Sequence, residues 1–310
     1  MSKPVALILL NYNTSAFTID CINSLKKHCD KSLFDIIVAD NGSTDGSLDR
    51  FKSLFPELIY IDNQENLGFA EGNNRALSYS IAQGYTYSLL LNTDTLVDED
   101  IVLKLSKHLD QHTEAAGVQP AIYWMHDKSK IWGGEGCFDE LLGMTYPDVK
   151  VPGSEQQAGF KNSKWLSGCC TLFRNSALID CGLLNKQFFL YYEDVELCYR
   201  IRQTGYLLHY LPGCKMYHEA GASGKERVAN KEGTLNPIIH YYICRNRIWF
   251  LRGYAKTFYY PINVISSIVY YSALFVYFKL RGRNQKASML YKGFRDGFFT
   301  QKALIWPSNK

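Results

Sequence analysis

Residues Leu89-Leu-Leu-Asn-Thr-Asp-Thr95 join an apolar run to a short polar step. Such a run is typical of a buried strand, and the polar residues then stand at its carboxyl end. Open α/β sheets bind their ligands at that edge. Side chains two residues apart on an extended backbone point to the same side, so Asn92 and Asp94 can bind one hard divalent cation, Mg2+ or Mn2+. A strand-end turn with capping residues is the structural alternative.

Three similar apolar runs precede this one, and a helical pattern follows each of them. The runs are Val5–Leu10, Asp35–Ala39 and Leu58–Ile61. Alternation of strand and helix at this spacing predicts an α/β fold with a doubly wound, mainly parallel sheet. Each run ends in a polar loop, and loops at the carboxyl ends of parallel strands face one crevice. These loops are Asn11-Tyr-Asn13, Asp40–Gly46 and Asn66–Asn74.

Composition limits the class of protein. The chain has 310 residues and is 46% hydrophobic, which is enough for a large core. The residues from Met1 to Leu10 lack the pattern of a secretion signal. Nine cysteines without a Cys-x-x-Cys pair predict reduced thiols rather than a zinc site or a disulfide framework. The net charge of +4 is small, and no nucleic-acid partner is expected.

The second half contains the residues that suggest chemistry. Glu193 and Asp194 follow an apolar, aromatic run and begin a predicted helix. Helix capping explains them structurally, but partial desolvation would also raise the pKa of a carboxyl group and make it a better proton acceptor. Gly168 lies in a predicted strand over residues 165–173, where it would allow a substrate close to the backbone. His218 ends a short predicted strand and is either a structural residue or a ligand.

Four of these stretches together resemble the nucleotide-binding half of the inverting family 2 glycosyltransferases of the GT-A fold. They are Asn11-Tyr-Asn13, Val38–Asp45, Asn66–Ala70 with Asn74, and Leu91-Asn-Thr-Asp94. The resemblance covers about residues 4 to 250 and is greatest to bacterial rhamnosyltransferase-like members. Asn92 stands where many relatives have an aspartate, which leaves one carboxylate in the motif.

The resemblance implies a nucleotide-sugar donor and a role for each matching residue. Asp40 would read the pyrimidine, Asp94 would bind the metal and His218 would complete the metal or diphosphate site. Asp194 would be the catalytic base, and Glu193 would orient the acceptor. Arg245 would lie near phosphate, with a surface salt bridge as its alternative. The remaining donor-binding residues would be Asn11, Asn13, Asn41, Asn66, Gly68, Asn74, Asn92 and Gly168.

The C-terminal region differs from the rest. Residues 257–278 contain no charged side chain, and residues 279–310 contain eight Lys or Arg against one acid, Asp296. This pattern favours a segment that lies on an anionic membrane surface, with a buried helix pair or a homodimer contact as alternatives. We therefore expect a glycosyltransferase domain over residues 1–255, divided into a nucleotide-binding half (1–115) and an acceptor half (116–255). A helical tail over 256–310 would follow it.

The function expected from these observations is transfer of a sugar from dTDP-rhamnose or a UDP-sugar to a glycan or a polyprenyl-linked acceptor. The reaction would take place in the cytoplasm at the inner face of the membrane and contribute to bacterial surface polysaccharide. The alternatives are a non-catalytic nucleotide- or glycan-binding protein and a sugar nucleotidyltransferase. A nucleotidyltransferase would be expected to have a Gly-rich basic loop after the first strand, where this chain has Asn11-Tyr-Asn13.

Overall fold

The structure is a computed structural model that describes residues 3–150, 159–221, 225–230 and 232–306. The chain forms two compact units. Unit 1 consists of residues 1–137, 146–184 and 194–223, and unit 2 of residues 138–145, 185–193 and 224–310. These units are divided differently from the two domains that the sequence suggests, because helix α8 (Pro237–Tyr254) belongs with the C-terminal helices.

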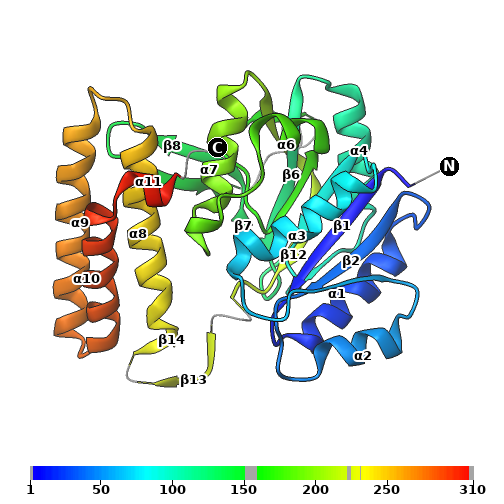
Figure 1. The fold of residues 1–310 in the computed structure, drawn as a ribbon, viewed down its shortest axis with the longest axis horizontal. Coiled ribbons are helices and arrows are strands. Elements are labelled where there is room, and N and C mark those ends of the chain that lie inside the picture. Colours follow the sequence, from blue (N-terminus) through cyan, green and yellow to red (C-terminus); the bar gives the residue numbers. More distant parts are fainter. Residues whose placement is uncertain (1–2, 151–158, 222–224, 231, 307–310) are drawn as a thin grey trace. The chain divides into compact units, whose positions relative to one another are not determined.

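Unit 1 is built on one mixed, mainly parallel sheet, as the sequence predicts (Figure 1). Its strand order is β10-β12-β6-β11-β4-β1-β2-β3. Strands β1, β2, β3, β4, β6 and β12 run in one direction, and β11 runs against its neighbours β4 and β6. The strands are β1 (Val5–Asn11), β2 (Phe34–Asp40), β3 (Ile59–Asp62), β4 (Tyr87–Leu91), β6 (Ala115–Trp124), β10 (Lys161–Asn162), β11 (Cys170–Arg174) and β12 (Leu207–His218). Two short strands, β5 (Thr95–Leu96) and β7 (Ile131–Gly133), pair with β12 and β6.

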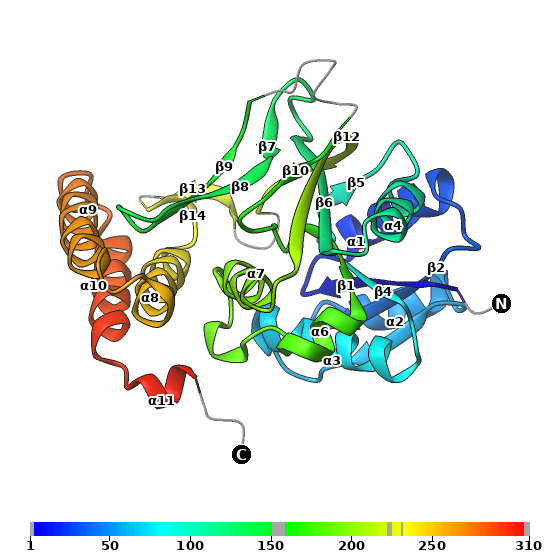
Figure 2. The same cartoon turned by 90° about the horizontal axis from the view of Figure 1, so that it is seen from above.

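Helices cover both faces of this sheet because its central strands are apolar on both sides. Val5, Leu7 and Leu9 of β1 face one core, which α1 (Ser15–His28), α2 (Ser47–Leu54) and α4 (Ile101–Gln111) close. The alternate residues Ala6 and Ile8 face the other core. That core is closed by α3 (Gly68–Ala82), α6 (Asn175–Cys181) and α7 (Glu193–Gln203) (Figure 2).

Two predicted strands differ from those observed. The strand expected over residues 165–173 begins only at Cys170, because the residues before it form a turn around Gly168. The short strand expected to end at His218 is the second half of a longer strand, β12, which begins at Leu207 and runs through Pro212-Gly213. The register of β12 against β6 shifts between Leu211 and Lys215, so the irregularity takes up the Pro-Gly pair and the strand continues to His218.

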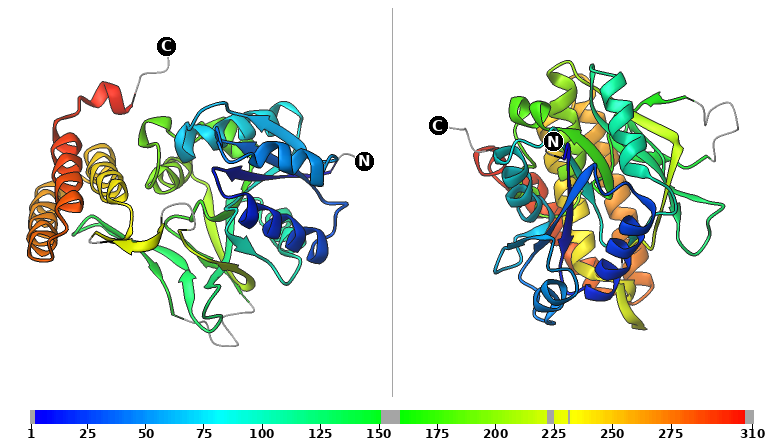
Figure 3. Two further views of the ribbon diagram at one scale, coloured as in Figure 1. Left: turned by 90° about the horizontal axis from the view of Figure 1, so that it is seen from below. Right: turned by 90° about the vertical axis from the view of Figure 1, so that its right-hand side faces the viewer.

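Unit 2 is mainly helical. Helices α8, α9 (Tyr260–Leu280) and α10 (Asn284–Phe299) lie side by side (Figure 3) and share a small core that includes Cys244, Ile248 and Leu290. A short helix, α11 (Lys302–Ile305), a single 3-10 turn (Lys186–Phe188) and the hairpin β13 (Lys225–Asn230) and β14 (Gly233–Leu235) complete it. The hairpin of β8 (Glu135–Asp139) and β9 (Met144–Asp148) has residues in both units.

Candidate active site

Asp94 and His218 are in direct contact at the carboxyl edge of the sheet. Asp94 lies in the loop after β4, and His218 is the last residue of β12, where it pairs with Thr95 of β5. The Oδ1 atom of Asp94 lies 3.0 Å from Nε2 of His218. The Gly221 backbone N–H donates to Oδ2 at 3.2 Å. Both side chains are buried, with 8% and 3% of their surface exposed. The structure thus brings together two residues that are 124 positions apart.

This pair fits a divalent cation. Ligand atoms 2.0–2.1 Å from an octahedral ion lie about 3 Å apart in adjacent positions, which is the spacing of Asp94 Oδ1 and His218 Nε2. Carboxylate with imidazole suits Mn2+ better than Mg2+. The Trp132 ring packs edge-on against His218, with ring centroids 4.4 Å apart. Because Nδ1 of His218 has no hydrogen-bond partner among the described residues, this packing helps to fix the orientation of the imidazole.

Asp194 lies across a short backbone segment from this pair. The Gly168 N–H donates to Oδ2 of Asp194 at 3.0 Å, and the Val195 N–H donates to Oδ1 at 2.8 Å. Burial raises the pKa of the Asp194 carboxyl group above its ordinary value, although both N–H donors lower it. A Cβ at position 168 would lie 3.0 Å from the Phe69 ring, so a larger residue would require this ring to shift.

Cys169 connects the two carboxylates. Its carbonyl accepts a hydrogen bond from the Asn92 N–H at 2.8 Å, and its neighbour Gly168 contacts Asp194. The pKa of the buried Cys169 thiol is raised well above its usual value, first by burial and then by the negative charges of Asp94 and Asp194. Both carboxylates therefore lie near one residue, on the same side of the fold.

The loop after β2 is organised around Asp40. Its carboxylate is buried and accepts hydrogen bonds from the Asn11 side chain at 2.8 Å and from the Ser43 N–H at 2.9 Å. Asn11 also accepts bonds from Thr14 and Thr18, so its side chain is committed to the protein. Asn13 has a positive φ of 53° and accepts a bond from the Thr44 N–H. Asn11 and Asn13 thus shape the loop that holds Asp40.

The amides of the next loop are also engaged with the protein. The buried Asn41 side chain donates to Asn66 Oδ1 at 3.0 Å and to the carbonyl of Gly68 at 3.2 Å. Asn74 donates to the carbonyl of Leu184 and accepts from its N–H. These contacts hold the loop around Gly68, which has a φ of 74°. The family resemblance implies that these residues contact the donor, whereas the structure gives their side chains protein partners.

Glu193 and Arg245 both belong to unit 2. Glu193 is buried at the start of α7. Arg245 is also buried and donates to the carbonyls of Gln187 and Phe188, while its guanidinium stacks over Trp249 at 4.1 Å. The alternative prediction of a surface salt bridge for Arg245 is therefore wrong. Within unit 2, Arg245 holds the segment before α7.

Two residues near the site, Trp132 and Ser43, were not predicted from the sequence. Trp132 packs on His218, and Ser43 accepts bonds from the Asn11 side chain and from the Asn13 N–H. Neither residue type signals function on its own. Trp132 is 86 positions from His218, and Ser43 is 32 and 30 positions from Asn11 and Asn13. No local sequence pattern connects residues that are so far apart in the chain.

The family model described as "Glycosyl transferase family 2" matches residues 6–182. This range holds β1 to β4, the Asp40 and Asp94 loops, and Gly168. The chain belongs to glycosyltransferase family 2. This match confirms the family predicted from the sequence.

Relatives of this glycosyltransferase share its length to different degrees. The dTDP-rhamnosyl transferase RfbF of Shigella flexneri is 23% identical over 252 residues, which is 81% of each chain. The low-salt glycan biosynthesis hexosyltransferase Agl10 of Haloferax volcanii is 27% identical over 206 residues, 66% of this chain and 63% of Agl10. The mannosyltransferase PcManGT of Pyrobaculum calidifontis, solved with GDP-Man and Mn2+, is 12% identical. It superposes with a TM-score of 0.57 over 96% of this chain and 88% of its own. This last similarity concerns the fold and confirms the predicted GT-A architecture.

Proposed function

We propose that this glycosyltransferase moves a sugar from a nucleoside-diphosphate donor to an acceptor hydroxyl with inversion at the anomeric carbon. The observation that carries the proposal is the placement of Asp94 with His218 and, across Gly168-Cys169, of Asp194. A cation bound by Asp94 and His218 would supply positive charge next to the leaving diphosphate.

Asp194 is the residue of this group suited to take the acceptor proton. Its pKa is raised by burial, which makes the carboxylate a stronger base than an exposed aspartate. The Gly168 and Val195 N–H groups hold both of its oxygens in place. As the acceptor oxygen bonds to the anomeric carbon, the bond to the diphosphate breaks and the hydroxyl proton passes to Asp194. Attack opposite to the leaving group inverts the anomeric centre.

The proposed donor is dTDP-rhamnose, with a UDP-sugar as the alternative, and the proposed acceptor is a surface glycan or its polyprenyl-linked precursor. Two relatives support this choice, a dTDP-rhamnosyl transferase that matches over most of both chains and a hexosyltransferase of glycan biosynthesis. The buried Asp40 carboxylate already accepts hydrogen bonds from Asn11 and Ser43. Its remaining lone pairs could accept a further bond from an N–H group of the donor base.

Donor hydrolysis in the absence of acceptor tests this proposal. The purified chain is incubated with dTDP-rhamnose, UDP-sugars and GDP-mannose in the presence of Mn2+, and release of the nucleoside diphosphate is measured. We expect one donor to be hydrolysed faster than the others, in a reaction that a chelator stops. Binding without hydrolysis of any donor would contradict the proposal and favour a non-catalytic binding protein.

We also propose that α9 lies on the cytoplasmic face of an anionic membrane. Among the described residues, α9 is the helix with the length and apolar composition to cross a membrane, and only 22% of its apolar window is buried. Its exposed face is aliphatic: Ile265, Val269 and Leu280 expose 61%, 64% and 83% of their surface. The opposite, buried face contains Asn263, Ser267, Tyr271 and Phe278. A helix with its aliphatic face outward is suited to an apolar environment.

Two charges on the aliphatic face should remove membrane binding. The Ile265→Asp/Val269→Asp variant should float with vesicles of phosphatidylcholine and phosphatidylglycerol about 100-fold less strongly than the unaltered chain. The reason is that each aliphatic side chain contributes about 1.5–3 kcal/mol when it leaves water. Ile179→Asp on α6, a residue that is 62% exposed, is the matched control. Equal flotation of all three proteins would contradict membrane binding. Loss of a dimer in the double variant would instead indicate the homodimer contact.

A further inference from the structure

A cluster of side chains of the types that bind metals lies at the opposite edge of the sheet from Asp94. His112 is the C-cap of α4, Glu114 directly precedes β6, and His209 is near the start of β12. His209 pairs with Val118 of β6, and His218 with Trp124, six residues further along that strand. At 3.3 Å per residue the two sites are about 20 Å apart. The cluster is thus separate from Asp94 and His218, to which we assign the cation beside the donor diphosphate.

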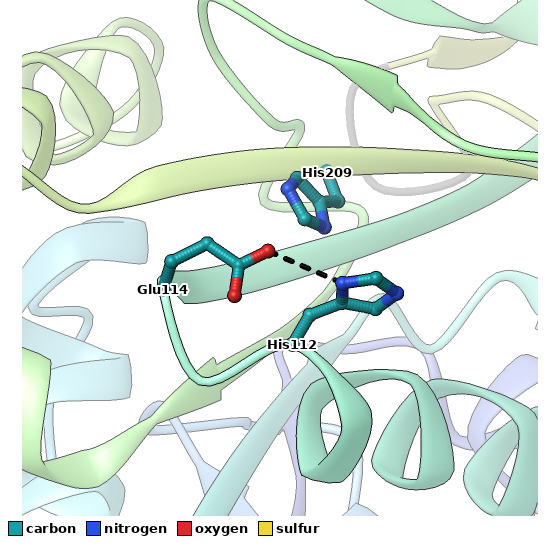
Figure 4. A group of neighbouring side chains, drawn as sticks. All are labelled: His112, Glu114 and His209. Atoms are coloured by element: carbon teal, nitrogen blue, oxygen red, sulfur yellow. Dashed lines mark hydrogen bonds and ion pairs between the residues drawn. The ribbon is translucent and has the colours of Figure 1, made fainter.

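The three side chains converge. One nitrogen or carboxylate oxygen from each of them lies within 4.8 Å of the other two. The Nδ1 atom of His112 is 3.2 Å from Oε1 of Glu114. Figure 4 shows the imidazole of His209 above this pair, with a ring nitrogen facing His112. Ligands 2.0–2.1 Å from a tetrahedral ion lie about 3.3 Å apart. The His112–Glu114 spacing already matches. The side chains of His112 and Glu114 are half-exposed and exposed, so both can move to close the remaining gap to His209.

His209 has a nitrogen that the protein does not use. The residue is fully buried, and its Nδ1 is bonded to Nε2 of His108 at 2.9 Å. The other nitrogen, Nε2, has no hydrogen-bond partner in the part of the chain that the structure describes. A buried polar atom without a partner destabilises a fold, whereas a bound ion would satisfy it. A hydrogen bond from the second nitrogen to a neighbour is the usual arrangement of a metal-binding histidine.

The surroundings favour a cation and hold the site in shape. The C-terminal end of a helix attracts positive charge, and His112 stands at the end of α4. The backbone on both sides is fixed, since the Leu207 N–H donates to the carbonyl of Glu114 and the Ala115 N–H donates to that of His112. The ring of Phe160 stacks on His209 with centroids 4.2 Å apart and contacts His112 edge-on with centroids 4.6 Å apart.

We propose that His112, Glu114 and His209 bind Zn2+ at the amino edge of the sheet. Two imidazoles and one carboxylate form a typical zinc ligand set with a fourth position for water, whereas Mg2+ and Ca2+ prefer oxygen ligands throughout. The ion joins the end of α4 and the start of β6 to the start of β12. This proposal does not depend on the proposed function, because none of the three residues belongs to the sugar-transfer site.

The test uses the full chain in an Asp94→Asn background, so that the pair at the other edge cannot account for the result. The protein is freed of metal with a chelator, and Zn2+ is titrated by calorimetry and by thermal unfolding. We expect one equivalent to bind and to raise the Tm. Co2+ in place of Zn2+ should show the intense visible absorption of a tetrahedral complex.

The ligand variants decide the outcome. His112→Ala and Glu114→Gln change exposed or half-exposed side chains, so they should fold. Each should weaken Zn2+ binding by roughly 100-fold or more, since loss of even an outer partner costs 10–100-fold. His126→Ala, which removes an exposed histidine outside the cluster, should leave binding unchanged. Zn2+ binding of unchanged strength in the His112→Ala protein, or no binding in the Asp94→Asn background, would overturn the proposal.

Discussion

Asp194→Asn should remove most sugar transfer while leaving donor binding nearly unchanged. The amide has the shape of the carboxylate and can still accept one of the two hydrogen bonds that the Gly168 and Val195 N–H groups donate. It cannot take a proton from the acceptor, and a general base contributes about 10²–10⁴ in rate. The measurement is steady-state transfer together with donor affinity by calorimetry. A variant that keeps more than roughly a tenth of the rate would exclude Asp194 as the base.

The pH dependence of the same residue provides a second measurement. Burial raises the pKa of Asp194, so its basic form is lost at a higher pH than for an exposed aspartate. Activity should therefore fall as the pH drops through this raised value, and the acid limb should disappear in the Asn variant. Because ionisation of a carboxyl group with a raised pKa destabilises the folded state above that pH, Asp194→Asn should not lower the Tm at pH 7. Glu193→Gln, the comparison variant on the same helix, should retain the acid limb.

Asp94→Asn should abolish the dependence of activity on a divalent cation. It replaces the one carboxylate in the Leu91-Asn-Thr-Asp94 motif, and the neutral amide is a far weaker ligand beside His218. Loss of a metal that stabilises a leaving group costs several kcal/mol, so we expect a decrease of about 10²–10⁴-fold in transfer. The measurement is the rate as a function of Mn2+ concentration.

Asp98→Asn is the control for this variant. Asp98 is an exposed carboxylate four residues away whose contact is with the Tyr217 hydroxyl at 2.8 Å, next to His218 on β12. It should retain the activity and the Mn2+ response of the unaltered protein. If Asp94→Asn responded to Mn2+ like Asp98→Asn, the assignment of the metal to Asp94 would be wrong.

The fold could be predicted from the sequence because each strand and the loop that follows it are marked by residues that are adjacent in the chain. Buried parallel strands such as β1 and β4 are continuous apolar runs, and their ends coincide with polar loops. The predicted strands begin or end within two residues of those observed at β1, β2 and β3. The contact between Asp94 and His218 could be expected only through the family resemblance, since no periodicity connects residues that far apart.

The roles of the amide side chains could not be predicted in the same way. Asn11, Asn41 and Asn74 belong to a motif that is associated with the donor, but each bonds to backbone or side chains of the protein itself. A sequence motif records that a residue type is needed and not which atom it contacts. The cluster of His112, Glu114 and His209 was missed for a related reason, because its third member lies 95 residues after Glu114 on another strand.

The reversed strand β11 has a consequence for engineering. It follows β6 in the chain and yet lies between β4 and β6, with Leu172 paired to Leu89 on one side and to Val118 on the other. A fragment that stops at residue 115 would leave the long edge of β4 bare, and unpaired edges promote aggregation. Chimeras between homologous enzymes should therefore place their crossover after Arg174, so that β4, β6 and β11 all come from one parent.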